Sequence, residues 1–159
     1  MKYIVFILLL SLFIFCGKNT NNECVYAAAP TSLFFTIKQN GKIYPDSVLN
    51  SFKVSYYKNG TKNYVLYYGK VGGEYKDSGL LAVQNIDVIA TGDPIVNKFY
   101  VEYGYNFPSD SFFVDYAKPS KETNCVYKLK TIYFNNGNAV KIDTVLSSKL
   151  FSTVYIFNK

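Results

Sequence analysis

The sequence predicts an all-β fold, an antiparallel β-sandwich of about seven to nine strands that is immunoglobulin-like in general type. Tyr and Phe, which favour strands, contribute 16 and 13 of the 159 residues. Apolar and polar residues alternate in several short segments, and Asn-Gly or Pro-containing turns separate these segments at regular spacing. No segment of the expected domain sustains a helical period. A small β-barrel is the alternative architecture.

The first half of the domain contains segments with strand character, each followed by a turn. Two of these turns are Asn-Gly pairs, at Asn40-Gly41 and Asn59-Gly60. The second pair joins the strands of the clearest hairpin in the chain. The expected strands are residues 33–38, 52–57, 62–68 and one or two strands within residues 80–89.

In the second half, alternation assigns one side of each strand to a core. Pro108-Ser109-Asp110 separates the first two of these strands, and the last two are expected near residues 140–145 and 153–157. The side chains expected on the same side as the core in the earlier strands are Phe99, Val101, Tyr103 and Tyr105, then Phe112, Val114 and Tyr116, then Tyr127, Leu129, Thr131 and Tyr133.

The N-terminus has the layout of a bacterial export signal. Lys2 precedes an apolar run, residues 3–15, that ends at Cys16 and is shorter than the roughly 18 to 20 residues needed to cross a bilayer core. An ordinary secretory cut needs small residues before the cleaved bond, but Ile14 and Phe15 precede Cys16. We therefore expect a signal helix followed by lipid attachment at Cys16. A secreted chain without lipid and an uncleaved N-terminal anchor are the alternatives.

This reading divides the chain into three parts and leaves two cysteines in an oxidising compartment. The parts are a lipoprotein signal peptide at 1–15, a lipidated tether at 16–30 and a β-sandwich domain at 31–159. Cys24 and Cys125 form an even pair once Cys16 is lipidated, so we expect a disulfide between them, with two unpaired thiols as the alternative.

Composition excludes several classes of function. The chain has no His, which removes Ser-His-Asp and Cys-His catalysis and the usual zinc sites. Its net charge of +6 comes from Lys alone, without the Arg forks that favour nucleic-acid recognition, so no nucleic-acid partner is expected. Asp87, Asp93 and Asp110 lie near expected turns but lack calcium-ligand spacing, and turn formation explains them. No metal, cofactor or catalytic residue is predicted.

Tyrosines supply the candidate binding surface. An exposed tyrosine on a flat sheet can stack on a sugar ring or anchor a protein partner. About half of the residues in any strand face the core, and outward tyrosines also pack against neighbouring strands, so most of the tyrosines are explained by the fold. Tyr57, Tyr67 and Tyr100 remain as the candidate surface.

Three passages carry a resemblance to a known group of proteins. They are the signal ending in Cys16-Gly17-Lys18, the strand Ser111-Phe112-Phe113-Val114-Asp115-Tyr116, and Asn124-Cys125-Val126-Tyr127 at the start of the next strand. In these passages the chain resembles the small, uncharacterised lipoproteins of the Bacteroidetes. Phe15 departs from the small residue usual before the lipid-bearing cysteine. The group has no established activity, so the resemblance implies no functional residues.

These observations together lead us to expect a non-catalytic binding or assembly module of the bacterial cell envelope. A lipid on Cys16 would hold it at a membrane, facing the periplasm or the cell surface. The expected partner is an envelope protein or a glycan. A carboxylate-dependent enzyme acting on glycans is the alternative, because paired carboxylates can perform acid-base chemistry without His.

Overall fold

The computed structural model describes Cys24 and residues 31–104, 108–135 and 137–159. The expected signal peptide, Cys16 and all of the expected tether except Cys24 lie outside these residues, as does Tyr105. Within the described residues, no helix combines the length and apolar character needed to cross a membrane.

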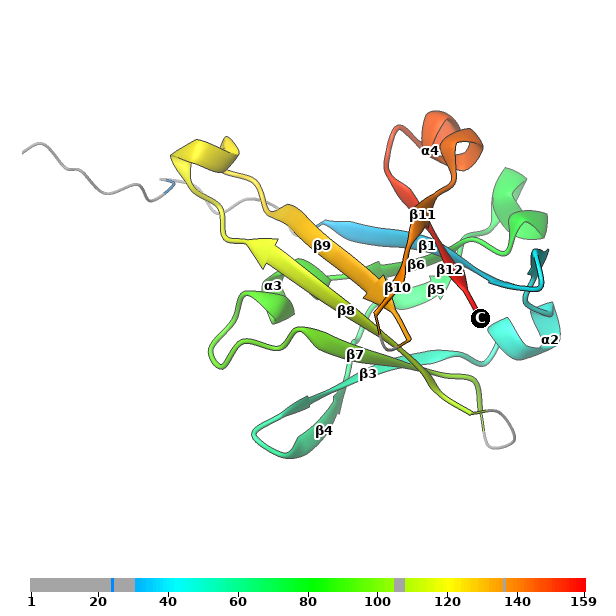
Figure 1. The fold of residues 1–159 in the computed structure, drawn as a ribbon, viewed down its shortest axis with the longest axis horizontal. Coiled ribbons are helices and arrows are strands. Elements are labelled where there is room, and N and C mark those ends of the chain that lie inside the picture. The colour runs from blue at the N-terminus through cyan, green and yellow to red at the C-terminus, as the bar shows by residue number, and fades with distance from the viewer. Residues whose placement is uncertain (1–23, 25–30, 105–107, 136) are drawn as a thin grey trace, which may run out of the picture.

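The protein is mostly strands, arranged in two six-stranded sheets (Figure 1). Sheet 1 has the order β11-β12-β1-β6-β5, with β2 paired to β1. Its strands are β1 (Ser32–Gln39), β2 (Lys42–Ile43), β5 (Tyr68–Lys70), β6 (Leu81–Gln84), β11 (Lys141–Ile142) and β12 (Val154–Asn158). Sheet 2 has the order β10-β9-β8-β7-β3-β4. Its strands are β3 (Lys53–Lys58), β4 (Thr61–Tyr64), β7 (Lys98–Glu102), β8 (Asp110–Ala117), β9 (Lys128–Phe134) and β10 (Asn138–Ala139).

The all-β prediction is confirmed, but the strand count and pairing differ from it. The described residues form twelve strands, because β2, β10 and β11 are two-residue pairings too short to leave an alternating pattern. The pairing is antiparallel except between β1 and β12, which run parallel with Phe35 opposite Tyr155. The alternation within one strand does not show whether a partner strand more than a hundred residues away runs parallel or antiparallel to it.

Phenylalanines join the two sheets in one core. Phe112 of β8 lies 6.0 Å from Phe35 of β1 and 5.6 Å from Phe157 of β12, measured between ring centroids. Phe157 also stacks at 4.7 Å on Phe134 of β9. All four rings are buried, and burying each contributes roughly 1.5 to 3 kcal/mol.

Both Asn-Gly turns form as predicted. Asn40 and Gly41 have φ of 52° and 77°, and Asn59 and Gly60 have φ of 52° and 76°. Two consecutive residues with positive φ give the tight turn whose twist matches a β-hairpin. The second turn places Tyr57 opposite Lys62 across the β3–β4 pair.

Two expected strands are helices in part. Residues 80–89 form β6 and then α3 (Ile86–Ala90), because Asn85 in a left-handed conformation ends the strand and a helical spacing buries Ile86 and Ala90. Residues 140–145 form only β11 before α4 (Thr144–Leu150) begins. The Asp143 side chain accepts a hydrogen bond from Leu146 N at 3.0 Å and caps this helix. The remaining helical segments are α2 (Asp46–Leu49), η1 (Gly73–Ser78) and η2 (Lys121–Thr123).

The second strand of the predicted β3–β4 hairpin is shorter than expected. β4 ends at Tyr64, and β5 begins at Tyr68 in the other sheet. Val65 is buried in the core and donates a backbone hydrogen bond to Val54 O at 2.8 Å, so the chain turns inward there and crosses between sheets.

The predicted face of β9 is wrong beyond Leu129. A β-bulge pairs Asp115 with Thr131 but Tyr116 with Leu129, so Lys130 is an extra residue that shifts the alternation by one. Ile132 packs against the core, while Tyr133 is 41% exposed. A bulge leaves no mark in the alternation of either strand taken alone.

Candidate functional site

The outer surface of sheet 2 is where the described structure gathers tyrosines and lysines. Val54 of β3 and Phe99 and Val101 of β7 are fully buried, so the residues alternating with them point away from the core. The strand register places the outward residues of β4 beside those of β3. We name this set the tyrosine face; its members are Lys53, Ser55, Tyr57, Lys62, Tyr64, Lys98, Tyr100 and Glu102.

Two of the three predicted binding tyrosines meet on the tyrosine face. Tyr57 and Tyr100 lie with their ring centroids 5.7 Å apart and their planes at 84°, an edge-to-face pair. Tyr57 is 51% exposed. Packing against Tyr100 therefore orients the Tyr57 ring while leaving much of its surface open to a ligand.

Tyr67 lies elsewhere. It is 58% exposed, in the crossing between β4 and β5, and its carbonyl accepts a hydrogen bond from Gln84 N at 2.9 Å. It lines a different hollow, at the edge of sheet 1 with Lys70. The hairpin pattern suggested one continuous strand through residue 68, and the crossing at Val65 is the reason Tyr67 belongs to another surface.

A hollow of about 460 Å³ opens on the tyrosine face beside Tyr57 and Tyr100. Glu102 lies in its lining, between Ser55 and Lys62. Its Oε1 atom accepts a hydrogen bond from the buried Ser55 hydroxyl and lies 2.8 Å from Lys62 Nζ. No hydrogen bond from a described residue reaches Oε2. Glu102 thus lines the hollow and is held through one oxygen, while no described donor occupies the other.

The charges around Glu102 keep it ionised. Partial burial opposes ionisation, but hydrogen bonds from Lys62 and Ser55 and the positive charges of Lys62 and Lys53 outweigh it, so the pKa of Glu102 is lowered. The hydrogen bond to Glu102 raises the pKa of Lys62. Both groups therefore carry their charges at neutral pH.

The remaining lysines of the tyrosine face lie over aromatic rings. Lys53 Nζ is 5.8 Å from the centre of the Tyr64 ring, and Lys98 Nζ is 5.5 Å from that of Tyr100. Cation–π contacts at these distances orient a lysine without neutralising it.

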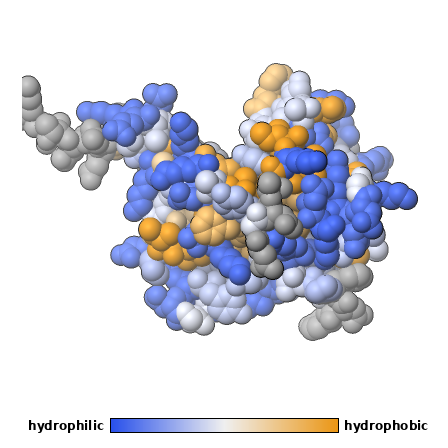
Figure 2. Space-filling view, in the orientation of Figure 1, coloured by the Kyte–Doolittle hydropathy of each residue, from blue (hydrophilic) through white to orange (hydrophobic). Residues whose placement is uncertain are grey.

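In the space-filling view, apolar residues form separate patches over the α3–β8 region and beside α4, with hydrophilic residues between them (Figure 2).

Glu102 and Lys62 were not predicted as site residues. Their signal was partly present, because the Asn59-Gly60 turn fixes the register that puts Lys62 opposite Tyr57. The pairing of β3 with β7, which puts Lys53 opposite Glu102, joins strands nearly fifty residues apart and has no local signal.

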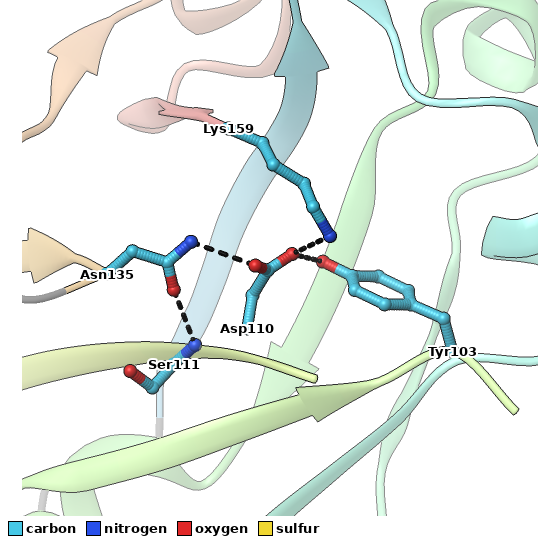
Figure 3. Close-up of polar contacts among 5 residues, drawn as sticks. All are labelled: Tyr103, Asp110, Ser111, Asn135 and Lys159. Atoms are coloured by element: carbon cyan, nitrogen blue, oxygen red, sulfur yellow. Dashed lines mark hydrogen bonds and ion pairs between the residues drawn. The ribbon is translucent and has the colours of Figure 1, made fainter. Parts of the chain in front are cut away.

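The carboxylate of Asp110 lies at the centre of a second polar cluster, at the start of β8, in which Asp110 and Tyr103 are buried and their neighbours half-buried (Figure 3). Asp110 Oδ2 accepts hydrogen bonds from the Tyr103 hydroxyl at 2.7 Å and from Lys159 Nζ at 2.9 Å. Asp110 Oδ1 accepts one from Asn135 Nδ2 at 2.8 Å, and Asn135 in turn accepts one from Ser111 N at 2.9 Å. Both oxygens of Asp110 are therefore occupied by donors of the protein itself.

The acidic residues near turns have separate roles. Asp87 Oδ2 accepts hydrogen bonds from Thr31 N and Thr31 Oγ1, each at 2.6 Å, and Asp87 Oδ1 accepts one from Val88 N at 2.8 Å. Asp93, in contrast, is exposed. In the part of the chain that the structure describes, no three Asp, Glu, Cys or His side chains come together as a metal site.

Cys24 and Cys125 form a disulfide with their Cα atoms 5.5 Å apart, in agreement with the expected pairing. The bond closes a loop between residues 101 positions apart. In the chain-entropy model such a loop contributes on the order of 4 to 5 kcal/mol of stability. It also fastens Cys24 to the segment between η2 and β9.

Comparison of the chain with protein-family models, with curated proteins and with solved structures gave no match.

Proposed function

We propose that the chain is a non-catalytic cell-envelope lipoprotein whose β domain binds its partner through the tyrosine face. The observation that carries this proposal is the pair formed by exposed Tyr57 and half-buried Tyr100 beside a Glu102 carboxylate with one oxygen unoccupied by described residues. Ligand-binding sites are typically hollows lined by aromatic rings and a few polar groups in fixed positions.

Binding is favoured over glycan hydrolysis because of the number of carboxylates. A glycosidase of the common kind needs two carboxyl groups roughly 5 to 10 Å apart across the scissile bond. Among the described residues that line the hollow, Glu102 is the one acidic side chain. Lys62 and Ser55 also lower the pKa of Glu102, which is the opposite of what a general acid needs.

The envelope location rests on the N-terminal sequence and on the disulfide. The apolar run before Cys16 has the length of a signal peptide. A disulfide between Cys24 and Cys125 suits an oxidising compartment. With the resemblance in residues 111–116 and 124–127, these features support placing the chain among the small lipoproteins of the Bacteroidetes.

We further propose that the two sheets form an immunoglobulin-like β-sandwich. The contacts of Phe112 with Phe35 and Phe157 across the sheets support this type of fold. The antiparallel meander β7–β8–β9–β10 also supports it.

The intact mass of the protein extracted from its native membrane tests the lipid attachment. We expect a chain beginning at Cys16 with a diacylglyceryl group and an amide-linked acyl chain. Cys24 and Cys125 should react with an alkylating agent only after reduction. The Cys16→Ser variant should lack the lipid mass and leave the membrane fraction. A wild-type chain without lipid would refute the lipoprotein proposal.

Hydroxyl-radical footprinting of the full chain tests the binding face without knowledge of the partner. We expect slower oxidation of Tyr57 and Tyr100 in intact envelopes than in detergent-extracted protein. Tyr67, which is exposed on another surface, is the internal control and should oxidise equally in both. Equal oxidation of Tyr57 in the two preparations would show that the tyrosine face carries no partner.

A further inference from the structure

We infer that the ligand of the tyrosine face is a saccharide that carries acidic groups. This inference rests on the proposed function and names the chemistry of the partner. Three features of the described residues carry it: the open tyrosine rings, the unoccupied oxygen of Glu102 and an excess of positive charge.

The hollow has room for a sugar and shares Glu102 with a neighbouring hollow. Its volume of about 460 Å³ is within the range of small-molecule sites. A second hollow of about 210 Å³ shares Glu102 and Gly104 with it and is lined by Lys53 and Tyr64. Tyrosine rings therefore stand on both sides of Glu102, and each can stack on the apolar face of a sugar ring. The two hollows suit consecutive rings of an oligosaccharide.

Glu102 is arranged to accept hydrogen bonds from hydroxyl groups. Ser55 and Lys62 hold the carboxylate through Oε1, which leaves Oε2 able to accept from a ligand. The lowered pKa keeps Glu102 an acceptor. Sugar hydroxyls supply donors for Oε2, whereas an apolar ligand would leave this oxygen without a partner.

The net positive charge of the tyrosine face indicates that the sugar carries acidic groups. The tyrosine face carries three lysines, Lys53, Lys62 and Lys98, and the single carboxylate of Glu102. Lys53 lies opposite Glu102 across β3 and β7, Lys62 is paired with it, and Lys98 lies at the other end of β7. Lys62 pairs with Glu102, but neither Lys53 nor Lys98 is in an ion pair with a described residue. Both lie over tyrosine rings, at opposite sides of the site. A carboxylate-bearing sugar would complement this excess of positive charge.

A saccharide suits this surface better than an extended peptide. Strand β3 lies between β4 and β7, so its backbone groups are already hydrogen-bonded on both sides. A peptide that adds to a sheet needs a free strand edge, which on this side of sheet 2 is the four-residue β4, whereas Tyr57 and Tyr100 lie on the inner strands β3 and β7. The site offers side-chain groups and ring faces, which are the groups that saccharides use.

Binding of full-length protein to acidic polysaccharides tests the inference. The probes are polygalacturonate, alginate and hyaluronate, with fully methyl-esterified polygalacturonate as a neutral probe of the same sugar rings. We expect binding to at least one acidic polymer, and about tenfold weaker binding wherever the acidic groups are esterified.

Variants then locate the binding. Tyr57→Ala combined with Tyr100→Ala should weaken it by about tenfold or more, and Lys98→Gln should weaken binding of the acidic polymer alone. Tyr67→Ala is the control, because this tyrosine is as exposed as Tyr57 but lies in the crossing between β4 and β5, beside another hollow, and this variant should bind as the wild type does. Unfolding curves of each variant verify that the domain is intact.

Several results would overturn the inference. Absence of binding to all three acidic polymers would do so, as would equal affinity for the esterified and acidic forms or insensitivity to the two tyrosine substitutions. If footprinting in envelopes still protected Tyr57, the binding face would stand and its ligand would be something other than an acidic saccharide. If Tyr57 were unprotected there, the proposed function itself would fail.

Discussion

Glu102 and Asp110 show how one set of residue types serves two purposes. They lie eight positions apart on the paired strands β7 and β8. Each carboxylate has a lysine partner and tyrosines close by. Val101, directly before Glu102, pairs with Asp110, so alternation sends the two carboxylates to opposite faces of sheet 2. Asp110 points into the core and Glu102 points out.

The difference between them is in how completely the protein satisfies each carboxylate. The Asp110 side chain is 6% exposed, and three donors of the protein occupy its two oxygens. The Glu102 side chain is 25% exposed, and Oε2 receives no hydrogen bond from a described residue. A buried carboxylate with both oxygens hydrogen-bonded joins parts of the fold, whereas a partly exposed one with an unoccupied oxygen can bind a ligand. The comparison therefore predicts large stability effects at Asp110 and binding effects at Glu102.

Asp110→Ala should give the largest loss of stability. It leaves the ammonium of Lys159 and the hydroxyl of Tyr103 without their acceptor in a mostly buried site. Removing one partner of such a pair costs about 3 kcal/mol or more. Urea unfolding at neutral pH measures the change. Asp115→Ala is the matched control, because its pair with Lys130 is exposed and should contribute about 0 to 1 kcal/mol. Equal losses in the two variants would refute the contrast drawn above.

The fold was predictable from the sequence where local chemistry decides the structure. Asn40-Gly41 and Asn59-Gly60 identify hairpin turns because Asn and Gly tolerate positive φ. Alternation identifies the buried sides of β1, β3, β7 and β8. The bulge at Lys130 and the change from strand to helix at Asn85 depend on contacts with distant segments, so local patterns could not reveal them.

Tyr103→Phe should have an intermediate effect. The hydroxyl donates to a charged acceptor, so its loss should cost about 1 to 2 kcal/mol while the ring keeps its contact with Tyr44, 5.3 Å away. Unfolding of the Tyr103→Phe and Asp110→Ala single variants and of the double variant forms a cycle. We expect the two losses to be less than additive, because Asp110→Ala already removes the same hydrogen bond. Additive losses would show that Tyr103 and Asp110 act independently.

Stability should also fall in alkali, and the Asp110 cluster should contribute to the fall. Burial, followed by the hydrogen bond to Asp110, raises the pKa of Tyr103 well above its ordinary value of 10.0. The folded protein thus keeps a proton that the unfolded chain releases, so stability decreases as pH rises above about 10. Burial lowers the pKa of Lys159, but Asp110 outweighs it and raises the pKa overall. The stability that the raised pKa of Lys159 contributes is complete below pH 10.5. It is lost as pH rises through the pKa of Lys159 in the folded protein. The slope of unfolding free energy against pH should be shallower in Tyr103→Phe, and an unchanged slope would contradict the assignment.

The site was less predictable than the fold. Tyr57 and Tyr100 were found because outward tyrosines on strands can be recognised from alternation. Tyr67 shares that local appearance but lies on another surface, because the chain leaves sheet 2 at Val65 and enters sheet 1. Glu102 gains its role from Ser55 and Lys62, which only the pairing of β3 with β4 and β7 brings to it.

Glu102→Gln should have the smallest effect on stability, about 0.5 kcal/mol or less at neutral pH. The amide oxygen of Gln can still accept the hydrogen bond from Ser55, and the lost ion pair with Lys62 lies at the surface. The pKa of Glu102 is lowered from its ordinary value of 4.5. The stability that ionised Glu102 contributes is therefore present above pH 4.5 and is lost as pH falls through the pKa of Glu102 in the folded protein. Unfolding at pH 7 and at about pH 3 should therefore show a smaller acid-induced loss of stability in Glu102→Gln than in the wild type.

Polygalacturonate binding at neutral pH should weaken in the Glu102→Gln variant, whereas Asp115→Asn should leave this binding unchanged. A Glu102→Gln protein that is strongly destabilised but binds normally would reverse the comparison, making Glu102 the structural carboxylate of the pair.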